Sequence, residues 1–165
     1  MRICLALILL LATTAPASAQ ATIYLVRHAE RADSGTMAGT TMATDPDLSE
    51  TGRAWAESLA SMLKDAGIKA IYTIEYKRTR QTAEPLAKAI GVTATVVPAR
   101  DMKALVEKLK AADAPVLVVG HSNTVGETIA ALGVTEPVKI GDGDYDNLFV
   151  VVPGAKHTLV RLHYR

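Results

Sequence analysis

The chain has 165 residues, of which 49% are hydrophobic and 21% charged, and its 18 Lys and Arg against 17 Asp and Glu give a formal net charge of +1. That length suits one domain with a substantial buried core. The near-zero net charge argues against a general nucleic-acid partner or an anionic membrane surface, because both attract clustered positive charge. A bound anion would therefore need a local group of cations.

Residues 1–19 have the pattern of a secretory signal peptide. Arg2 supplies a positive start, residues 3–12 are apolar without interruption, and Ala17 and Ala19 form an A-x-A cleavage pattern. The apolar run is shorter than the ~20 residues that a membrane-spanning helix needs. We therefore expect cleavage after Ala19, with no membrane span afterwards. The alternative is that the leader stays attached and tethers the domain to a membrane.

Cleavage would leave residues 20–165 as an exported domain, periplasmic or secreted. Cys4 is the only cysteine of the chain, and it would leave with the leader. An exported domain without cysteine cannot form disulfides, so packing alone must stabilise its fold.

Six short segments are predicted to be β-strands, because each is rich in β-branched residues and bounded by turn formers. In chain order they are residues 22–26, 70–74, 94–98, 115–120, 147–152 and 157–165. The last segment alternates apolar and polar residues, as is typical of an edge strand with one solvated face.

Four helical patterns lie between these segments. The apolar face of the first comprises Trp55, Leu59, Met62, Leu63 and Ala66, and that of the second comprises Ala83, Leu86, Ala87 and Ile90. The third has Met102, Leu105, Val106 and Leu109 on its apolar face, and the fourth helix is predicted over residues 122–132. Ser49 is the expected N-cap of the first helix, and Gly67, Gly91 and Gly133 are the expected stops. Pro85 falls inside the second pattern, so we expect the regular helix to begin close to Pro85 or to kink there.

This alternation predicts an α/β fold: a three-layer sandwich with a mostly parallel central sheet and helices on both faces. No internal repeat or low-complexity linker interrupts residues 20–165, which we expect to form one domain. Residues 34–47 are small and polar, and they predict a mobile loop beside the first strand.

Polar side chains follow three of the predicted strands. His28 comes directly after the first strand, His121 follows Gly120 and opens a helix, and a basic group, Lys77, Arg78 and Arg80, follows residues 70–74. Ligands collect at the carboxyl ends of strands in open α/β sheets, and a helix N-terminus favours an anion. A single strand-end histidine is usually structural. Cations converging from three strand ends would repel one another without an anion, which favours a phosphate-type ligand.

Three motifs resemble the signatures of the histidine phosphatase superfamily, which has the phosphoglycerate-mutase-like fold. They are "LVRHAE" at 25–30, "RTRQTAEPLA" at 78–87 and "VVGHSNT" at 118–124. The segment "DLSETGRAWA" at 47–56 also resembles the family's approach to its first helix. Their order and spacing are similar to those of the short, single-domain R-H-A branch, and the resemblance spans nearly all of residues 20–165.

The resemblance implies roles for individual residues. His28 matches the histidine that attacks phosphorus and becomes phosphohistidine, while Arg27, Arg78 and His121 match the groups that hold the phosphoryl oxygens. A neutral imidazole is a competent nucleophile near neutral pH. Guanidinium groups fit phosphoryl oxygens in both geometry and charge. Asn123 is a further candidate for substrate binding, with helix capping as the alternative.

These cations would do the work of a metal ion, and no metal-ligand spacing such as H-x-x-x-H is present, so we expect neither metal nor other cofactor. Lys77 and Arg80 are expected to be solvated charges on a helix. The segment "GDGDYDNLFVV" at 141–151 lacks the glutamate of a calcium loop and is read as a turn or a rim of the site.

The general acid is open. In longer family members a glutamate in an insertion after the third strand often donates the proton, whereas here "VVPARDMKAL" passes directly into a helix. Glu30 is the first candidate, Asp101 the second, and Glu30 could equally be a structural partner of a nearby arginine. Without an acid, esters with leaving groups of low pKa would be favoured, because a positioned acid contributes ~10²–10⁴-fold. The first motif also departs from the family pattern, with Ala29 where glycine is usual.

The expected function is hydrolysis of a small-molecule phosphate monoester by an exported phosphatase. The alternative is a non-catalytic phosphate-binding protein on the same fold. A mutase is disfavoured, because the chain lacks segments that would enclose a bisphosphorylated substrate. The two expected rim segments, residues 34–45 and 140–147, carry no recognisable specificity code, so the natural substrate stays open, as does the oligomeric state.

Overall fold

The structure is a computed structural model that describes residues 20–33 and 45–165. The predicted signal peptide and most of the predicted mobile loop, residues 34–44, lie outside the described residues. Of the helices in the described part of the chain, none combines the length and the apolarity that crossing a bilayer requires.

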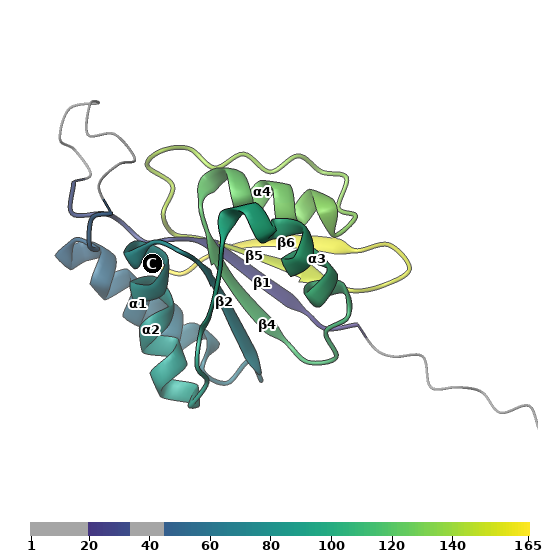
Figure 1. The fold of residues 1–165 in the computed structure, drawn as a ribbon, viewed down its shortest axis with the longest axis horizontal. Coiled ribbons are helices and arrows are strands. Elements are labelled where there is room, and N and C mark those ends of the chain that lie inside the picture. The colour runs from purple at the N-terminus through teal and green to yellow at the C-terminus, as the bar shows by residue number, and fades with distance from the viewer. Residues whose placement is uncertain (1–19, 34–44) are drawn as a thin grey trace, which may run out of the picture.

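Strands and helices alternate along the chain, as the sequence predicts (Figure 1). The elements are β1 (Ile23–Arg27), α1 (Glu50–Leu63), β2 (Ala70–Ile74), α2 (Lys77–Ile90), β3 (Thr95–Val97), α3 (Met102–Lys110), β4 (Val116–Gly120), α4 (Ser122–Ala131), β5 (Asn147–Val152) and β6 (Thr158–His163). A short 3₁₀ helix, Ala99–Asp101, leads into α3.

The strands form one sheet in the order β3-β2-β4-β1-β5-β6. The first four of these strands are parallel to one another, whereas β5 is antiparallel to β1 and β6 is antiparallel to β5. β1 is therefore central, with a parallel neighbour on one side and an antiparallel neighbour on the other. The predicted mostly parallel sheet is confirmed.

Helices cover both faces of this sheet (Figure 1). On one face, Leu105 of α3 and Ile129 of α4 pack in a core with Leu25 of β1. On the other face, Leu59 of α1 and Leu86 of α2 form a second core with other strand residues. Alternate side chains of β1 enter opposite cores, as the two-residue period of a strand requires. The predicted three-layer sandwich is confirmed.

The helix boundaries follow local chemistry in most places. The Ser49 hydroxyl accepts a hydrogen bond from the Gly52 N–H at 2.9 Å, which confirms Ser49 as the N-cap of α1. Gly91 ends α2 in the left-handed conformation, with φ of 68°. Met62 does not belong to the buried face, since it is 46% exposed. The buried stripe of α1 runs instead through a row of small and apolar residues, Gly52, Ala56, Leu59, Ala60 and Leu63.

Pro85 does not mark the start of α2, contrary to the expectation from its sequence. The helix begins at Lys77 and continues through Pro85. The first turn is held from outside the helix, because the Asp45 carboxylate accepts hydrogen bonds from the Lys77 N–H at 2.9 and 3.0 Å. The buried face of this first half contains Arg78 and other polar residues. Hydrophobic periodicity therefore could not reveal it.

Candidate active site

The register of β1 and β4 brings the two strand-end histidines together. Arg27 is the register partner of Gly120, and the His28 N–H donates to the Gly120 carbonyl at 2.9 Å. The rings of His28 and His121 consequently lie edge to face, with centroids 5.4 Å apart. A Cβ on Gly120 would stand 2.6 Å from the Thr124 hydroxyl oxygen, so the turn into His121 requires glycine.

His28 is a neutral imidazole whose hydrogen lies on Nδ1. Its Nδ1 lies 2.8 Å from the Ala29 carbonyl oxygen, which can only accept, so Nδ1 carries the hydrogen. In the neutral ring, Nε2 then keeps its lone pair. The side chain is 3% exposed, and burial, together with the charges of Arg27 and Arg78 and a contribution from His121, lowers its pKa to about 2. His28 is therefore neutral at every pH near neutrality.

His121 is held at the first turn of α4. Its backbone N–H donates to the Thr124 hydroxyl at 2.8 Å, which makes Thr124 a capping residue. Burial, followed by the charges of Arg78 and Arg27, lowers the pKa of His121 to about 4. Its Nε2 is buried and has no hydrogen-bond partner among the described residues.

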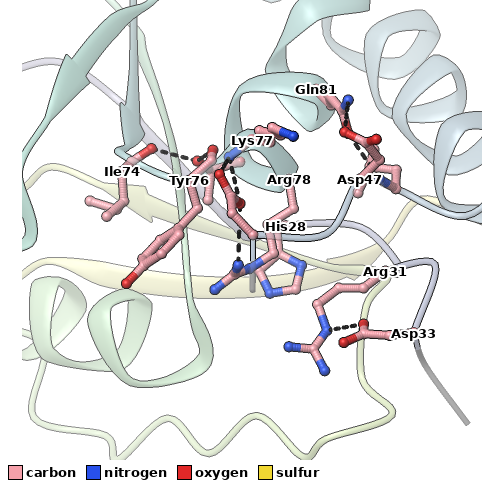
Figure 2. A network of polar contacts seen from close by, with 12 residues as sticks. His28, Arg31, Asp33, Asp47, Ile74, Tyr76, Lys77, Arg78 and Gln81 are labelled. Atoms are coloured by element: carbon pink, nitrogen blue, oxygen red, sulfur yellow. Dashed lines mark hydrogen bonds and ion pairs between the residues drawn. The ribbon is translucent and has the colours of Figure 1, made fainter. Parts of the chain in front are cut away.

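Two buried guanidinium groups flank the histidines. Arg78 is 2% exposed and Arg27 is 8% exposed. Arg27 donates from Nη1 to the carbonyl oxygens of Gly141 at 2.7 Å and Asp142 at 3.0 Å. Arg78 Nη1 lies 3.6 Å from an Asp45 carboxylate oxygen, and Figure 2 shows the Arg78 side chain beside the His28 ring. Burial lowers the pKa of both arginines, yet a guanidinium remains charged in proteins.

Several nitrogens of these side chains have no hydrogen-bond partner in the part of the chain that the structure describes, although Arg78 Nη1 has the longer ion-pair contact with Asp45. Within the described residues, Arg27 Nε, Arg78 Nε and Nη1, and His121 Nε2 are buried without a hydrogen-bond partner. Buried polar groups in folded proteins are nearly always hydrogen-bonded, because an unpaired one is costly. The three arginine nitrogens are donors, and His121 Nε2 is a donor in the tautomer that carries its hydrogen there, so the four nitrogens around one neutral histidine suit a tetrahedral oxyanion.

One hydroxyl couples the segment after β1, residues 28–30, to α2. Thr82 Oγ1 accepts a hydrogen bond from the Ala29 N–H at 2.9 Å and donates to the Arg78 carbonyl at 2.7 Å. The Ala29 methyl is fully buried in a small cluster with Leu48 and Ala56. That packing gives a physical reason for alanine where the family pattern has glycine.

Three residues around this site were not identified from the sequence as site residues. The Arg78 guanidinium lies over the ring of Tyr76 at 4.3 Å, and that ring meets His121 with centroids 5.2 Å apart. In the same way, the Arg27 guanidinium carbon lies 4.3 Å from the centroid of the Tyr145 ring, and the centroids of the Tyr145 and His28 rings are 5.9 Å apart. Tyr76 is the N-cap of α2 and Tyr145 lies in the loop before β5, and in such connections periodicity gives no signal.

Arg31 is the third of these residues. Its Nε pairs with an Asp33 carboxylate oxygen at 3.0 Å, a pair drawn in Figure 2. The Arg31 charge contributes to the lowered pKa values of Arg27, Arg78 and His121. Its place in the same strand-end segment as Arg27 and His28 was the available signal.

The other candidates lie differently. The Glu30 carboxylate accepts a hydrogen bond from the Ser49 hydroxyl at 2.7 Å, so it is engaged at the start of α1. Asp101 is exposed in the 3₁₀ helix, 3.9 Å from Arg100. Asn123 is exposed on the first turn of α4, and Lys77 and Arg80 are exposed on α2. In the part of the chain that the structure describes, no group of three or more potential ligands could hold a metal ion.

Comparison with known proteins agrees with this geometry. Residues 23–101 match the model of the histidine phosphatase superfamily (branch 1). A search of curated proteins found no match.

Solved structures share the fold along almost the whole chain. Phosphoserine phosphatase from Entamoeba histolytica, in complex with 3-phosphoglyceric acid, is 15% identical with a TM-score of 0.64, covering 88% of this chain and 96% of that one. A mycobacterial glucosyl-3-phosphoglycerate phosphatase complexed with VO3 is 15% identical with a TM-score of 0.63, covering 85% and 96%. The protein histidine phosphatase SixA complexed with tungstate is 21% identical with a TM-score of 0.64, covering 86% and 96%. At these identities the likeness concerns the fold, and the family match adds one finding: over residues 23–101 the chain is similar to the histidine phosphatase superfamily (branch 1).

Proposed function

We propose that the protein is an exported phosphatase that hydrolyses small-molecule phosphate monoesters through a covalent phosphohistidine on His28. One observation carries the proposal: a neutral, buried imidazole stands among buried cationic donors that lack acceptors among the described residues. The solved structures of similar fold include several phosphatases, which is consistent with this chemistry.

In the first step, the lone pair of His28 Nε2 attacks phosphorus and the bond from phosphorus to the ester oxygen breaks. The leaving alcohol takes a proton from solvent or from an acid. Arg27, Arg78 and His121 donate to the phosphoryl oxygens, whose charge they stabilise during transfer. The Nδ1–H bond to the Ala29 carbonyl keeps the His28 ring oriented and stabilises the positive charge that the ring acquires.

In the second step, water attacks the phosphohistidine. The phosphorus–nitrogen bond breaks, inorganic phosphate leaves, and the proton from water passes to phosphate or solvent. His28 returns to its neutral form, which its surroundings favour strongly. The cycle therefore needs no redox partner.

Turnover of a chromogenic phosphate ester tests the proposal. We expect activity in the wild-type chain and none above background in His28→Ala, because the nucleophile is gone. His157→Ala is the matched control, since His157 is a partly exposed histidine outside the site. Equal rates in wild type and His28→Ala would overturn the enzymatic function.

A labelled phosphodonor tests the covalent route separately. Rapid quenching should trap acid-labile, alkali-stable label on wild type and none on His28→Ala. Turnover without any trapped label would reject the phosphohistidine intermediate and leave direct hydrolysis by water.

The alternative, a phosphate-binding protein without catalysis, finds support in Glu30, whose carboxylate is engaged by Ser49. It predicts oxyanion binding in wild type with no turnover of any ester. Export rests on the sequence of residues 1–19 alone. Mass spectrometry of the protein expressed with its leader tests it: a mature chain that begins at Gln20 supports export, and an intact leader contradicts it.

A further inference from the structure

We infer that Tyr145 is a positioning residue of the active site, and that residues 163–165, here called the 163–165 clamp, hold it in place. The inference rests on the proposed function, because it concerns how the phosphate-binding arginine and the nucleophile are aimed. None of these residues belongs to the three sequence motifs of the family resemblance.

Tyr145 connects the two functional side chains of the first motif. Its ring lies 4.3 Å below the Arg27 guanidinium carbon and 5.9 Å from the His28 ring, centroid to centroid. The side chain is buried. A guanidinium stacked on an aromatic face and bonded at one end has little freedom to rotate.

The loop that carries Tyr145 is itself bound to Arg27. Arg27 Nη1 donates to the carbonyl oxygens of Gly141 and Asp142, as described above. Within the loop, the Asp144 carboxylate accepts a hydrogen bond from the Gly141 N–H at 2.9 Å. The position of this loop therefore fixes two things at once, the hydrogen bonds of the guanidinium and the aromatic surface on which it rests.

The 163–165 clamp holds the other end of the loop. The buried Tyr164 donates from its hydroxyl to the Tyr145 carbonyl at 2.5 Å, and its N–H donates to the Asp146 carbonyl at 3.1 Å. The Asp146 carboxylate pairs with Arg165 Nε at 2.8 Å and is hydrogen-bonded with His163 Nδ1 at 3.1 Å. Every residue of the clamp thus contacts Tyr145 or its neighbour.

A second contact supports the ring of Tyr145 from the side. The Arg165 guanidinium lies 4.7 Å from the centroid of the Trp55 ring, and Trp55 is 6.3 Å from Tyr145. Trp55 belongs to α1, so the 163–165 clamp, through Arg165, and the loop, through Tyr145, both contact the Trp55 ring of α1. Burial acts to raise the pKa of Asp146, but the hydrogen bonds from Arg165 and His163 lower it overall, so the carboxylate stays charged and the clamp closed at neutral pH.

The first test compares Tyr145→Leu with Tyr145→Phe. Leucine fills similar space without an aromatic face, and a desolvated cation–π contact is worth enough for about a 10-fold loss. We expect kcat/KM for a chromogenic ester to fall about 10-fold in Tyr145→Leu, with KM raised, and Tyr145→Phe to retain most of the wild-type rate. Equal kinetics in Tyr145→Leu and wild type would overturn the inference.

The second test asks whether the clamp acts through Tyr145. Arg165→Ala removes a half-exposed side chain, so the fold should persist, and Glu84→Gln breaks a remote surface ion pair as the matched control. We expect Arg165→Ala to lower kcat/KM and Glu84→Gln to leave it unchanged. In Tyr145→Leu the further Arg165→Ala change should add nothing, since coupled residues are not additive. Fully additive losses would overturn the link between clamp and ring.

Tungstate binding separates this inference from the proposed function. The dissociation constant of tungstate, measured by calorimetry, should rise in Tyr145→Leu and Arg165→Ala but not in Glu84→Gln. If wild type binds tungstate and turns over no ester, the proposed function fails while the positioning role is still measured. If the variants bind tungstate as tightly as wild type, the positioning role fails whatever the turnover shows.

Discussion

His121 faces His28 edge-on across the end of the sheet, and the Nε2 of His121 is buried without a partner among the described residues. A donor aimed at the transferring group typically contributes 10²–10³-fold to kcat. We expect His121→Ala to lower kcat by about that factor, with the nucleophile intact. Steady-state kinetics with a chromogenic ester measures it. A loss smaller than about 10-fold would remove His121 from the transition state.

The stability of the fold should depend on pH through the two histidines. Their pKa values, about 2 for His28 and about 4 for His121, lie below the ordinary 6.5, so the unfolded chain binds protons that the folded chain does not. Their stabilising contribution is present above pH 6.5 and lost as the pH falls below it, by up to about 1.4 kcal/mol per pH unit for each histidine.

We therefore expect the Tm to decrease from neutral pH towards pH ~5, and His28→Asn to show a shallower decrease. Thermal unfolding at a series of pH values tests this. The pKa of Asp146 is lowered from 3.8, so protonation of this carboxylate destabilises the fold only below the pH range tested. The comparison of wild type with His28→Asn is therefore unaffected by Asp146. Identical slopes in both proteins would contradict the lowered pKa of His28.

Gly52 of α1 packs against the backbone of Glu30, two residues after His28. A Cβ at this position would collide with the Glu30 carbonyl oxygen, which is backbone and cannot swing away. We expect Gly52→Ala to lower the free energy of unfolding by about 1–3 kcal/mol, as overpacking does. Gly143→Ala is the control, since a Cβ there meets nothing within 4 Å. Denaturant unfolding of both variants distinguishes a steric effect from a general cost of adding a methyl group.

The state of Glu30 makes a prediction about substrates. Because the Glu30 carboxylate is bonded to Ser49, which caps α1, we expect Glu30→Gln to lower the Tm. We expect rates to depend steeply on the leaving-group pKa in both wild type and variant, because Glu30 is bonded to Ser49 and Asp101 is exposed in the 3₁₀ helix, and a positioned acid is what offsets a poor leaving group. A series of aryl and alkyl phosphates measures the slope. A shallow slope that steepens in Glu30→Gln would establish Glu30 as the general acid.

The sequence predicts where those site residues lie that directly follow a strand, because the strand order and direction alone place them. The ends of β1 and β4 are visible in the alternation of strands and turns, and parallel strands in register place His28 and His121 at one edge. Arg78 follows β2 at the same edge, so it too could be placed. What local patterns could not show is contact between loops: Tyr145 stands in the loop before β5, and the 163–165 clamp that holds it lies at and just beyond the end of the edge strand β6.

The first half of α2 has no hydrophobic period for a related reason, although Lys77 and Arg80 were expected, and are found, as exposed charges on a helix. Its inward side is polar, with Arg78, Thr79 and Thr82 buried, so its hydrophobic period is absent where the site begins. Its first turn depends on Asp45, a carboxylate far away in the chain. Because polar residues occupy the buried face of this half, the hydrophobic pattern by which helices are recognised is absent there.

The bridge that Thr82 makes between Ala29 and Arg78 provides a natural spectroscopic probe. The Ala29 amide proton is buried and bonded to a hydroxyl that also bonds α2. Its exchange with deuterium should therefore be slow only while the loop and the helix stay joined. The amide resonance of Ala29 would thus report whether the segment that carries His28 separates from the start of α2, which carries Arg78, during a catalytic cycle.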